Sequence, residues 1–165
     1  MADIANSKLL NSIEGIGRPA NALVVLVKTE WNSEVVDELE RGCLRIFNQH
    51  GVPSKTIVVP GAVEIPFAIN RCLANNNAPT AFIALGCIIQ GGTPHFEYVC
   101  RSVTDGITAL NLSMQVPVIF GVLTVNTMEQ AQERIGGIHG HKGEEAAITA
   151  IKMMALNQQL KEGNF

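Results

Sequence analysis

Residues 81–95 read AFIALGCIIQGGTPH and contain the longest nearly unbroken apolar run of the chain. The run covers residues 81–89 without alternation of apolar and polar side chains, which is typical of a strand buried on both faces. It ends in a polar loop that contains two glycines. Because sheets covered on both faces are built from parallel strands joined by helices, this stretch indicates an α/β fold.

The segments on either side alternate between strand and helix patterns. A β-branched run at 22–27 precedes apolar residues at helical steps that begin after a cap at Asn32 or Ser33 and end near Gly51. A capping box of Thr127 and Gln130 opens a helix that ends near residue 135. Further strands are predicted at 56–59 and 116–125, further helices at 65–73, 97–114 and 144–160, and a glycine-rich loop at 136–143. We therefore predict a three-layer α-β-α sandwich with a four-stranded parallel sheet.

Length and composition predict one domain that associates with copies of itself. The chain has 165 residues, too few for two comfortable domains, and we expect an extended arm at 1–20 and a single α/β domain at 21–165. Asp, Glu, Lys and Arg make up only 16% of the residues, against roughly 25% in an ordinary soluble domain. This small share predicts that part of the surface is buried in a homo-oligomer.

Charge and hydropathy argue against nucleic acid and membrane as partners. The formal net charge is −3, which leaves no overall positive field for a polyanion. The run at 81–89 is about half as long as a membrane-spanning helix requires. The first residues lack the apolar core of a secretory signal, so we expect a cytoplasmic protein.

The four cysteines are expected to be free thiols in or near the core. Cys43, Cys72, Cys87 and Cys100 are widely spaced and form no CxxC pair, which argues against a zinc site or a disulfide framework. Cys87 can also be interpreted as a nucleophile, although a small core side chain is favoured.

Three loops are the candidates for a ligand site. In open parallel sheets, ligands bind beyond the carboxyl ends of the strands. The segments 29–32, 60–66 and 90–95 follow the first three predicted strands and are expected to share one edge of the sheet.

The segment from Gly91 to His95 carries the clearest chemistry. Backbone N–H groups at Gly91 and Gly92 and the hydroxyl of Thr93 suit an anion such as phosphate. His95 would stand beside that anion, and an imidazole can take or give a proton at neutral pH. A tight turn with a capping histidine explains the local pattern equally well.

A second basic segment surrounds the loop at 136–143. Arg134 and Lys142 can form the second half of a phosphate-binding site. The spacing of Lys142 and the surrounding glycines does not fit a nucleotide-binding Walker motif. Arg134 alone is also explained as a cation near a helix C-terminus. A metal site at His139 and His141 is disfavoured because no third ligand stands nearby in the sequence.

Three other side chains have both a functional and a structural interpretation. Trp31 can stack on a planar heterocycle or close the core. Glu64 can accept hydrogen bonds from sugar-like hydroxyls or serve as an ordinary acid at a helix start. For Phe120, core packing is strongly favoured.

Taken together, these segments resemble the lumazine synthase family, over residues 22–156. The most specific matches are PGAVEIP at 60–66, ALGCII at 84–89, GGTPHFEYV at 91–99, FGVLT at 120–124, EQA at 129–131 with ER at 133–134, and KG at 142–143 with AA at 146–147. Several ordered blocks at the expected spacing are far more specific than any one of them.

The resemblance implies a flavodoxin-like fold and a penultimate step of riboflavin biosynthesis. The reaction would condense 5-amino-6-(D-ribitylamino)uracil with 3,4-dihydroxy-2-butanone 4-phosphate to 6,7-dimethyl-8-ribityllumazine, without a metal or organic cofactor. The implied contacts to the uracil are Trp31, Asn32, Ala62, Val63, Glu64, Cys87, Ile88, Ile89 and Phe120. Those to the butanone phosphate are Gly92, Thr93, Arg134 and Lys142, and His95 would shuttle protons.

The resemblance also implies pentamers, in some members assembled into icosahedral shells, with active sites between subunits. Phe120, Arg134 and Lys142 would then come from the neighbouring copy. Such an assembly agrees with the small charged share of the sequence.

Three residues depart from the family pattern. Gln90 stands where arginine or lysine is common, Trp31 replaces the commoner phenylalanine, and His141 stands where asparagine is usual. We expect Gln90 to weaken binding of the phosphorylated substrate, and the larger indole of Trp31 to allow measurable riboflavin binding. The sequence assigns no role to His141.

Three functions of other classes are also compatible with the sequence. They are a flavin- or lumazine-binding protein without catalysis, a mainly structural shell, and, without the resemblance, a flavodoxin-like module with bound FMN.

Overall fold

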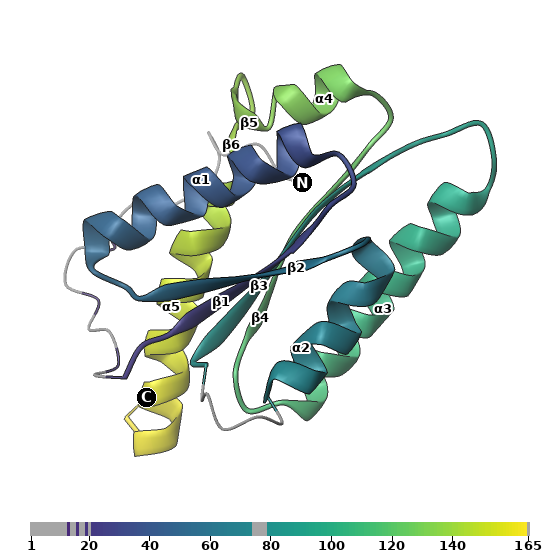
Figure 1. Cartoon of the computed structure of the whole chain (residues 1–165). Coiled ribbons are helices and arrows are strands. Elements are labelled where there is room, and N and C mark those ends of the chain that lie inside the picture. The colour runs from purple at the N-terminus through teal and green to yellow at the C-terminus, as the bar shows by residue number, and fades with distance from the viewer. Residues whose placement is uncertain (1–12, 14–15, 17–18, 20, 74–78, 165) are drawn as a thin grey trace.

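The computed structural model describes residues 13, 16, 19, 21–73 and 79–164. Its main sheet has four parallel strands, as the sequence predicts, and their order is β2-β1-β3-β4. The strands are β1 (Val24–Thr29), β2 (Ser54–Val59), β3 (Ala81–Ile89) and β4 (Val118–Val125). The fold is therefore α/β, with helices on both faces of the sheet (Figure 1).

The helices form two outer layers. One face of the sheet is covered by α1 (Ser33–His50) and α5 (Lys142–Glu162), and the other by α2 (Ile65–Leu73), which follows the short 3-10 helix η2 (Ala62–Glu64), and α3 (His95–Ser113) (Figure 1). After β4 the chain forms α4 (Met128–Gln132) and a two-stranded antiparallel ribbon of β5 (Ile135–Gly137) and β6 (Gly140–His141). The predicted three-layer sandwich is confirmed.

Strand β3 explains why the longest apolar run lacks alternation. Ile83 and Leu85 pack in the core beneath α1 and α5, whereas Phe82 and Ala84 pack in the core beneath α2 and α3. All four side chains are fully buried. A strand that contributes to two cores needs apolar residues on both of its faces.

The strand order places a switch point between β1 and β3. From β1 the chain passes over one face to β2, then crosses the other face to β3, which pairs with the opposite edge of β1. The loops that follow β1 and β3 therefore lead to opposite layers and leave a crevice between them.

The structure corrects the predicted helix and strand boundaries. Strand β1 begins at Val24 instead of residue 22, and α5 begins at Lys142 instead of residue 144. The predicted glycine-rich loop contains the β5–β6 ribbon, because Gly136 (φ 119°) and Gly140 (φ 75°) adopt the left-handed backbone that turns the chain back. Helix α4 ends at Gln132, earlier than predicted.

The predicted arm at 1–20 falls almost wholly outside the described residues. Within the described ranges, no helix is both long enough and apolar enough to cross a bilayer.

Candidate active site

An open hollow of about 530 Å³ lies at the carboxyl ends of β1 and β3. It is lined by Thr29, Trp31, Asn32, Gly61, Ala62, Val63, Glu64, Cys87, Ile88, Ile89, His95 and Val99. The prediction that the loops after the first three strands share one edge is therefore confirmed. Nine of these twelve residues are the ones that the sequence singles out.

Asn32 joins two of the contributing elements. Its backbone is left-handed (φ 55°), and its side-chain amide Nδ2 donates a 2.8 Å hydrogen bond to the carbonyl oxygen of Cys87 in β3. Asn32 is the N-cap residue of α1, which is one of the two residues predicted for this position. Its side chain makes no capping hydrogen bond. The amide instead fixes the loop after β1 to the end of β3.

Trp31 is held at the mouth of the hollow. Its side chain is 73% exposed, while the hydroxyl of buried Thr29 donates to its carbonyl oxygen at 3.3 Å. The interpretation of Trp31 as a residue that closes the core is therefore wrong. An exposed indole on an anchored backbone offers an apolar face for a planar ring.

Gly61 brings the loop after β2 close to Trp31. A methyl group built at Gly61 would lie 3.0 Å from Oε2 of Glu64 and 3.5 Å from Cδ1 of Trp31. The carboxylate and the indole thus flank the same small residue. A side chain at position 61 would occupy space between the two groups.

His95 is the first residue of α3 and is exposed at the hollow. Within the described residues its ring makes no hydrogen bond, and the N-cap position is taken by Pro94. The alternative interpretation of His95 as a capping histidine is therefore wrong. The imidazole is available to a ligand.

The loop before His95 is exposed, and the fold does not require its glycines. Gly91 and Gly92 lie outside the left-handed region, and nothing lies within 4 Å of a methyl group built at either position. Gly92 and Thr93 are exposed beside the hollow rather than part of its lining. Small residues here keep the backbone open to a ligand.

Cys87 forms part of the floor. The thiol is buried, and burial raises its pKa to about 11. A thiol with so high a pKa is a poor nucleophile at neutral pH. The favoured interpretation of Cys87 as a core side chain agrees with this, and all four cysteines are free.

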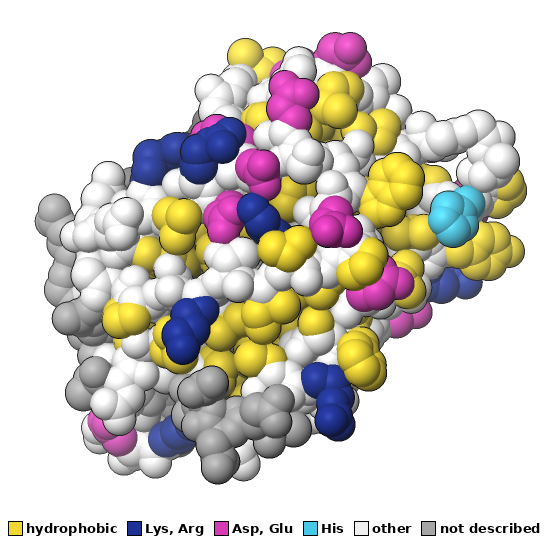
Figure 2. All heavy atoms as spheres, in the orientation of Figure 1, with side chains coloured by type: hydrophobic (Ala, Val, Ile, Leu, Met, Phe, Trp, Pro, Cys, Tyr) yellow, Lys and Arg dark blue, Asp and Glu magenta, His cyan; other side chains and the backbone are white. Residues whose placement is uncertain are grey.

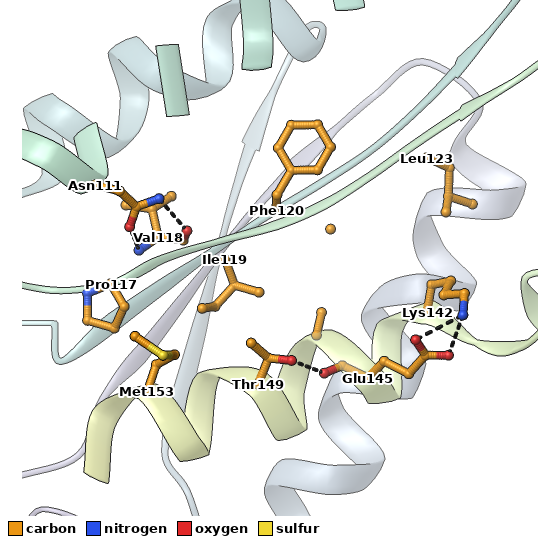
Figure 3. Close-up of a pocket in the computed structure, with 12 residues that line it drawn as sticks. Asn111, Pro117, Val118, Ile119, Phe120, Leu123, Lys142, Glu145, Thr149 and Met153 are labelled. Carbon is orange, nitrogen blue, oxygen red and sulfur yellow. Dashed lines mark hydrogen bonds and ion pairs between the residues drawn. The ribbon is translucent and has the colours of Figure 1, made fainter. Parts of the chain in front are cut away.

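Phe120 and Lys142 line a different hollow, of about 420 Å³, beside the edge strand β4. In Figure 3 the side chain of Phe120 extends from the face of β4 opposite to Ile119, which points toward α5. Phe120 is 41% exposed, so the expectation that it packs in the core is wrong. The two hollows share no lining residue.

Lys142 is almost completely buried at the start of α5. Its Nζ contacts both carboxylate oxygens of Glu145, at 2.7 and 2.9 Å (Figure 3). Its backbone N–H donates to the carbonyl oxygen of Arg134 at 2.8 Å. Lys142 and Arg134 are therefore adjacent through the backbone, although they are eight positions apart in sequence.

Arg134 lies just after α4. Its Nη1 donates to the carbonyl oxygen of Gln130 at 2.8 Å and lies 3.6 Å from Glu133. The interpretation of Arg134 as a cation at a helix C-terminus thus describes its contacts within one chain. Phe120, Arg134 and Lys142 are all absent from the hollow that contains His95.

His139 and His141 do not form a pair. His139 lies 3.7 Å from Glu133, whereas His141 is buried and lies 3.3 Å from Glu38 in α1. No group of three or more potential metal-ligating side chains occurs in the described part of the chain.

Sequence reasoning did not single out Val99, Gly61 or Glu145 as site residues. Val99 follows His95 by one helical turn, and Glu145 follows Lys142 by three residues, so helical spacing is the signal that identifies both. Gly61 is identified only by its distance from Trp31 and Glu64, which requires the fold.

The family model and the relatives found by sequence agree on one family. A family model described as 6,7-dimethyl-8-ribityllumazine synthase matches residues 21–158. A protein of that name from Parabacteroides distasonis is 48% identical over 132 residues, which cover 78% of this chain and 82% of the relative. Another from Cytophaga hutchinsonii is 44% identical over 152 residues, covering 90% and 95%. Among solved structures, a GDP-L-fucose synthetase from Naegleria fowleri bound to NADP matches with 12% identity and a TM-score of 0.35, over 89% of this chain and 48% of that one.

Proposed function

Because the chain belongs to the 6,7-dimethyl-8-ribityllumazine synthase family, we propose that it catalyses the penultimate step of riboflavin biosynthesis. The substrates are 5-amino-6-(D-ribitylamino)uracil and 3,4-dihydroxy-2-butanone 4-phosphate, and the products are 6,7-dimethyl-8-ribityllumazine, phosphate and water. The observation that carries the proposal is the hollow of about 530 Å³ that gathers Trp31, Glu64 and His95.

The uracil ring and its ribityl chain bind in this hollow. The exposed indole of Trp31 supports stacking on the planar ring, with Asn32 beside it. The carboxylate of Glu64 accepts hydrogen bonds from ribityl hydroxyls, next to Ala62 and Val63. Backbone groups of Cys87, Ile88 and Ile89 contact the polar edge of the ring.

The butanone phosphate binds at the exposed loop before α3. Backbone N–H groups around Gly92 and the hydroxyl of Thr93 bind the phosphate oxygens. The guanidinium of Arg134 and the ammonium group of Lys142 add positive charge. Lys142 is paired with Glu145 in the isolated chain, so it contributes mainly through the field near the phosphate.

Catalysis consists of orientation and proton transfer. The 5-amino group of the uracil attacks the butanone carbonyl, and loss of water gives a Schiff base; phosphate then leaves, and ring closure with loss of a second water gives the product. His95 carries protons between these steps, which the free imidazole at the rim of the hollow supports. Holding two reactants together supplies most of the remaining acceleration.

The complete site forms between two copies of the chain in a homo-oligomer. We infer that this oligomer is a pentamer or an assembly of pentamers and that it is located in the cytoplasm. One copy supplies the hollow with His95, and its neighbour supplies Phe120, Arg134 and Lys142. This arrangement is supported by the separation of the two groups of residues within one chain.

The surface supports this assembly. Figure 2 shows one face of the molecule, where hydrophobic side chains are exposed between scattered charged ones. Large apolar side chains that are exposed include Trp31, Phe67, Tyr98, Leu112, Phe120, Ile138 and Leu160. Burial against other copies removes such surface from water.

The test is to follow lumazine formation by absorbance and fluorescence with the parent, His95→Ala and Arg134→Ala proteins. We expect strong acceleration by the parent and a loss in each variant. Co-assembly of the two variants should restore about a quarter of the parental activity, since one interface in four then combines an intact His95 with an intact Arg134. A folded, oligomeric parent without activity would refute the proposed reaction. Failure of the mixed assembly to recover would refute the shared site.

A further inference from the structure

The ring of His141 lies in a space in α1 that only glycine leaves open. Gly42 is a buried residue in the middle of α1. A methyl group built there would lie 2.5 Å from Nδ1 of His141 and would also overlap Cε1. Glycine is unfavourable in a helix interior, so its presence at this position is explained by the ring that packs against it.

Two hydrogen bonds fix the orientation of the ring. Nδ1 of His141 accepts from the backbone N–H of Glu144 at 3.4 Å and so caps α5. Nε2 lies 3.3 Å from Oε1 of Glu38 in α1, to which it donates in the tautomer that the cap requires. The ring thus connects the start of α5 to α1.

Glu38 belongs to a larger charged network on the same side. Arg41 donates to it at 2.7 Å and Arg45 at 3.3 Å, and Arg45 also contacts Glu144 at 3.0 Å. The groups around the ring of His141 are therefore Glu38, Arg41 and Arg45 on α1 and Glu144 on α5. These charged groups link α1 to the start of α5, next to the ring of His141.

The backbone of His141 connects this anchor to Arg134 and Lys142. His141 pairs with Ile135 across the β5–β6 ribbon, and Lys142 N–H donates to the carbonyl oxygen of Arg134 at 2.8 Å. Arg134 immediately precedes the first strand of the ribbon and Lys142 immediately follows the second, so both lie at the open end of the hairpin. A shift of the His141 ring would therefore move both cations.

We propose that His141 is a positioning residue: by packing against Gly42 and capping α5, it holds the β5–β6 ribbon so that Arg134 and Lys142 face the phosphate of the substrate. The second half of this statement rests on the proposed function. The first half concerns the ribbon alone and can be measured without any substrate.

Amide hydrogen exchange of the assembled protein tests the anchor. We expect exchange of residues 134–144 to be about tenfold faster in His141→Ala and in Gly42→Ala, because each change removes or displaces the ring. Residues 81–89 in the central strand should keep their protection. His141→Asn, which can still cap α5, should fall between the parent and His141→Ala.

The double variant Gly42→Ala/His141→Ala is the matched control for the added methyl group. Without the ring, the methyl group has space, so exchange in the double variant should be no faster than in His141→Ala alone. His50→Ala, at the far end of α1, should leave the ribbon unchanged. Unchanged exchange in both single variants, or additive effects in the double variant, would overturn the proposal.

Kinetics test the consequence for the substrate. We expect the KM for the butanone phosphate to rise about tenfold in Gly42→Ala and His141→Ala, with kcat and the KM for the uracil within about twofold of the parent. A purely structural loss would lower the active fraction and hence kcat. Faster ribbon exchange with an unchanged KM would overturn the positioning role. An inactive parent would instead refute the proposed function, while the exchange data would still show whether His141 anchors the ribbon.

Discussion

The side-chain amide of Asn32 donates a 2.8 Å hydrogen bond to the carbonyl oxygen of Cys87. This bond crosses the switch point between β1 and β3 and links the residue before α1 to a residue two positions before the end of the buried strand β3. Asn32 adopts a left-handed backbone, and the side chain of the preceding Trp31 is exposed to solvent. The bond thus sets where the indole stands relative to the floor of the hollow.

Asn32→Gly should weaken binding of the uracil substrate. Glycine accepts the left-handed backbone, so the variant removes the hydrogen bond without adding strain. We expect the KM for the uracil to rise about fivefold and the free energy of unfolding to fall by about 1 kcal/mol. Steady-state kinetics and urea unfolding measure the two effects. Asn32→Asp, which also cannot donate, should behave alike, and a parental KM in both variants would contradict this role.

His95→Gln should lower kcat while leaving both KM values close to those of the parent. Glutamine retains a polar side chain but cannot shuttle a proton near neutral pH. Since orientation supplies much of the acceleration, we expect a loss of about tenfold to a hundredfold in kcat. Single-turnover kinetics give the value, with His50→Gln as the control on α1. Undiminished turnover would exclude His95 as the proton carrier.

Gln90→Arg should improve binding of the butanone phosphate. Gln90 is exposed immediately after β3, and its backbone N–H donates to the carbonyl oxygen of Val125 at 2.9 Å, which keeps the residue in place. An added positive charge beside the phosphate loop should lower the KM about threefold, and the gain should shrink at high salt. Gln90→Glu is the matched variant and should raise the KM. Equal KM values in the two variants would show that position 90 does not face the phosphate.

Riboflavin should bind to the parent through Trp31. The indole is exposed and large enough to stack on a flavin ring. We expect Trp31→Ala to weaken riboflavin binding about tenfold and Trp31→Phe to weaken it less. Quenching of flavin fluorescence measures the dissociation constants. If Trp31→Ala binds riboflavin as tightly as the parent, stacking on this residue is not the source of affinity.

Acid should remove the stabilising contribution of Glu38. The hydrogen bond from Arg41, together with those from His141 and Arg45, lowers the pKa of Glu38 from 4.5 to about 2. Above pH 4.5 the group is charged in the folded and unfolded states, and the full contribution is present. Below pH 4.5 the unfolded chain takes up the proton first, so the contribution declines as the pH falls toward 2.

The parent should therefore be more stable than Glu38→Gln at pH 7, by about 1 kcal/mol after solvent screening of this partly exposed network is considered. The difference should narrow between pH 4.5 and pH 2. Urea unfolding across that pH range measures the difference in the free energy of unfolding. Groups that titrate alike in both proteins do not contribute to this difference. A difference that stays constant with pH would show that Glu38 is not the titrating group.

Much of the fold follows from local patterns in the sequence. The unbroken apolar run at 81–89 matches β3 residue for residue, and the helical steps after Ser33 match α1. Both are long segments whose hydrophobic period is set by the layers that they contact. The β5–β6 ribbon was not predicted because its two strands are short and depend on positive φ angles at Gly136 and Gly140, which no period reveals.

The chemistry of the site could also be proposed in part. The residue types at 91–95 suggest an anion loop with a histidine because backbone N–H groups, a hydroxyl and an imidazole are adjacent in sequence. By contrast, sequence favoured core positions for Phe120 and Trp31, since aromatic side chains in or beside a strand are usually buried. Both are exposed.

Sequence alone determined the alternation of strands and helices, the family and the identity of the reactive groups, because these depend on the period and the chemistry of neighbouring residues. Tertiary structure was needed to bring Trp31, Glu64 and His95 into one hollow and to separate them from Phe120 and Lys142. It was also needed to join His141 to Gly42, residues 99 positions apart in the chain. Such contacts are fixed by how layers pack around two cores, and packing depends on distances that no local pattern encodes.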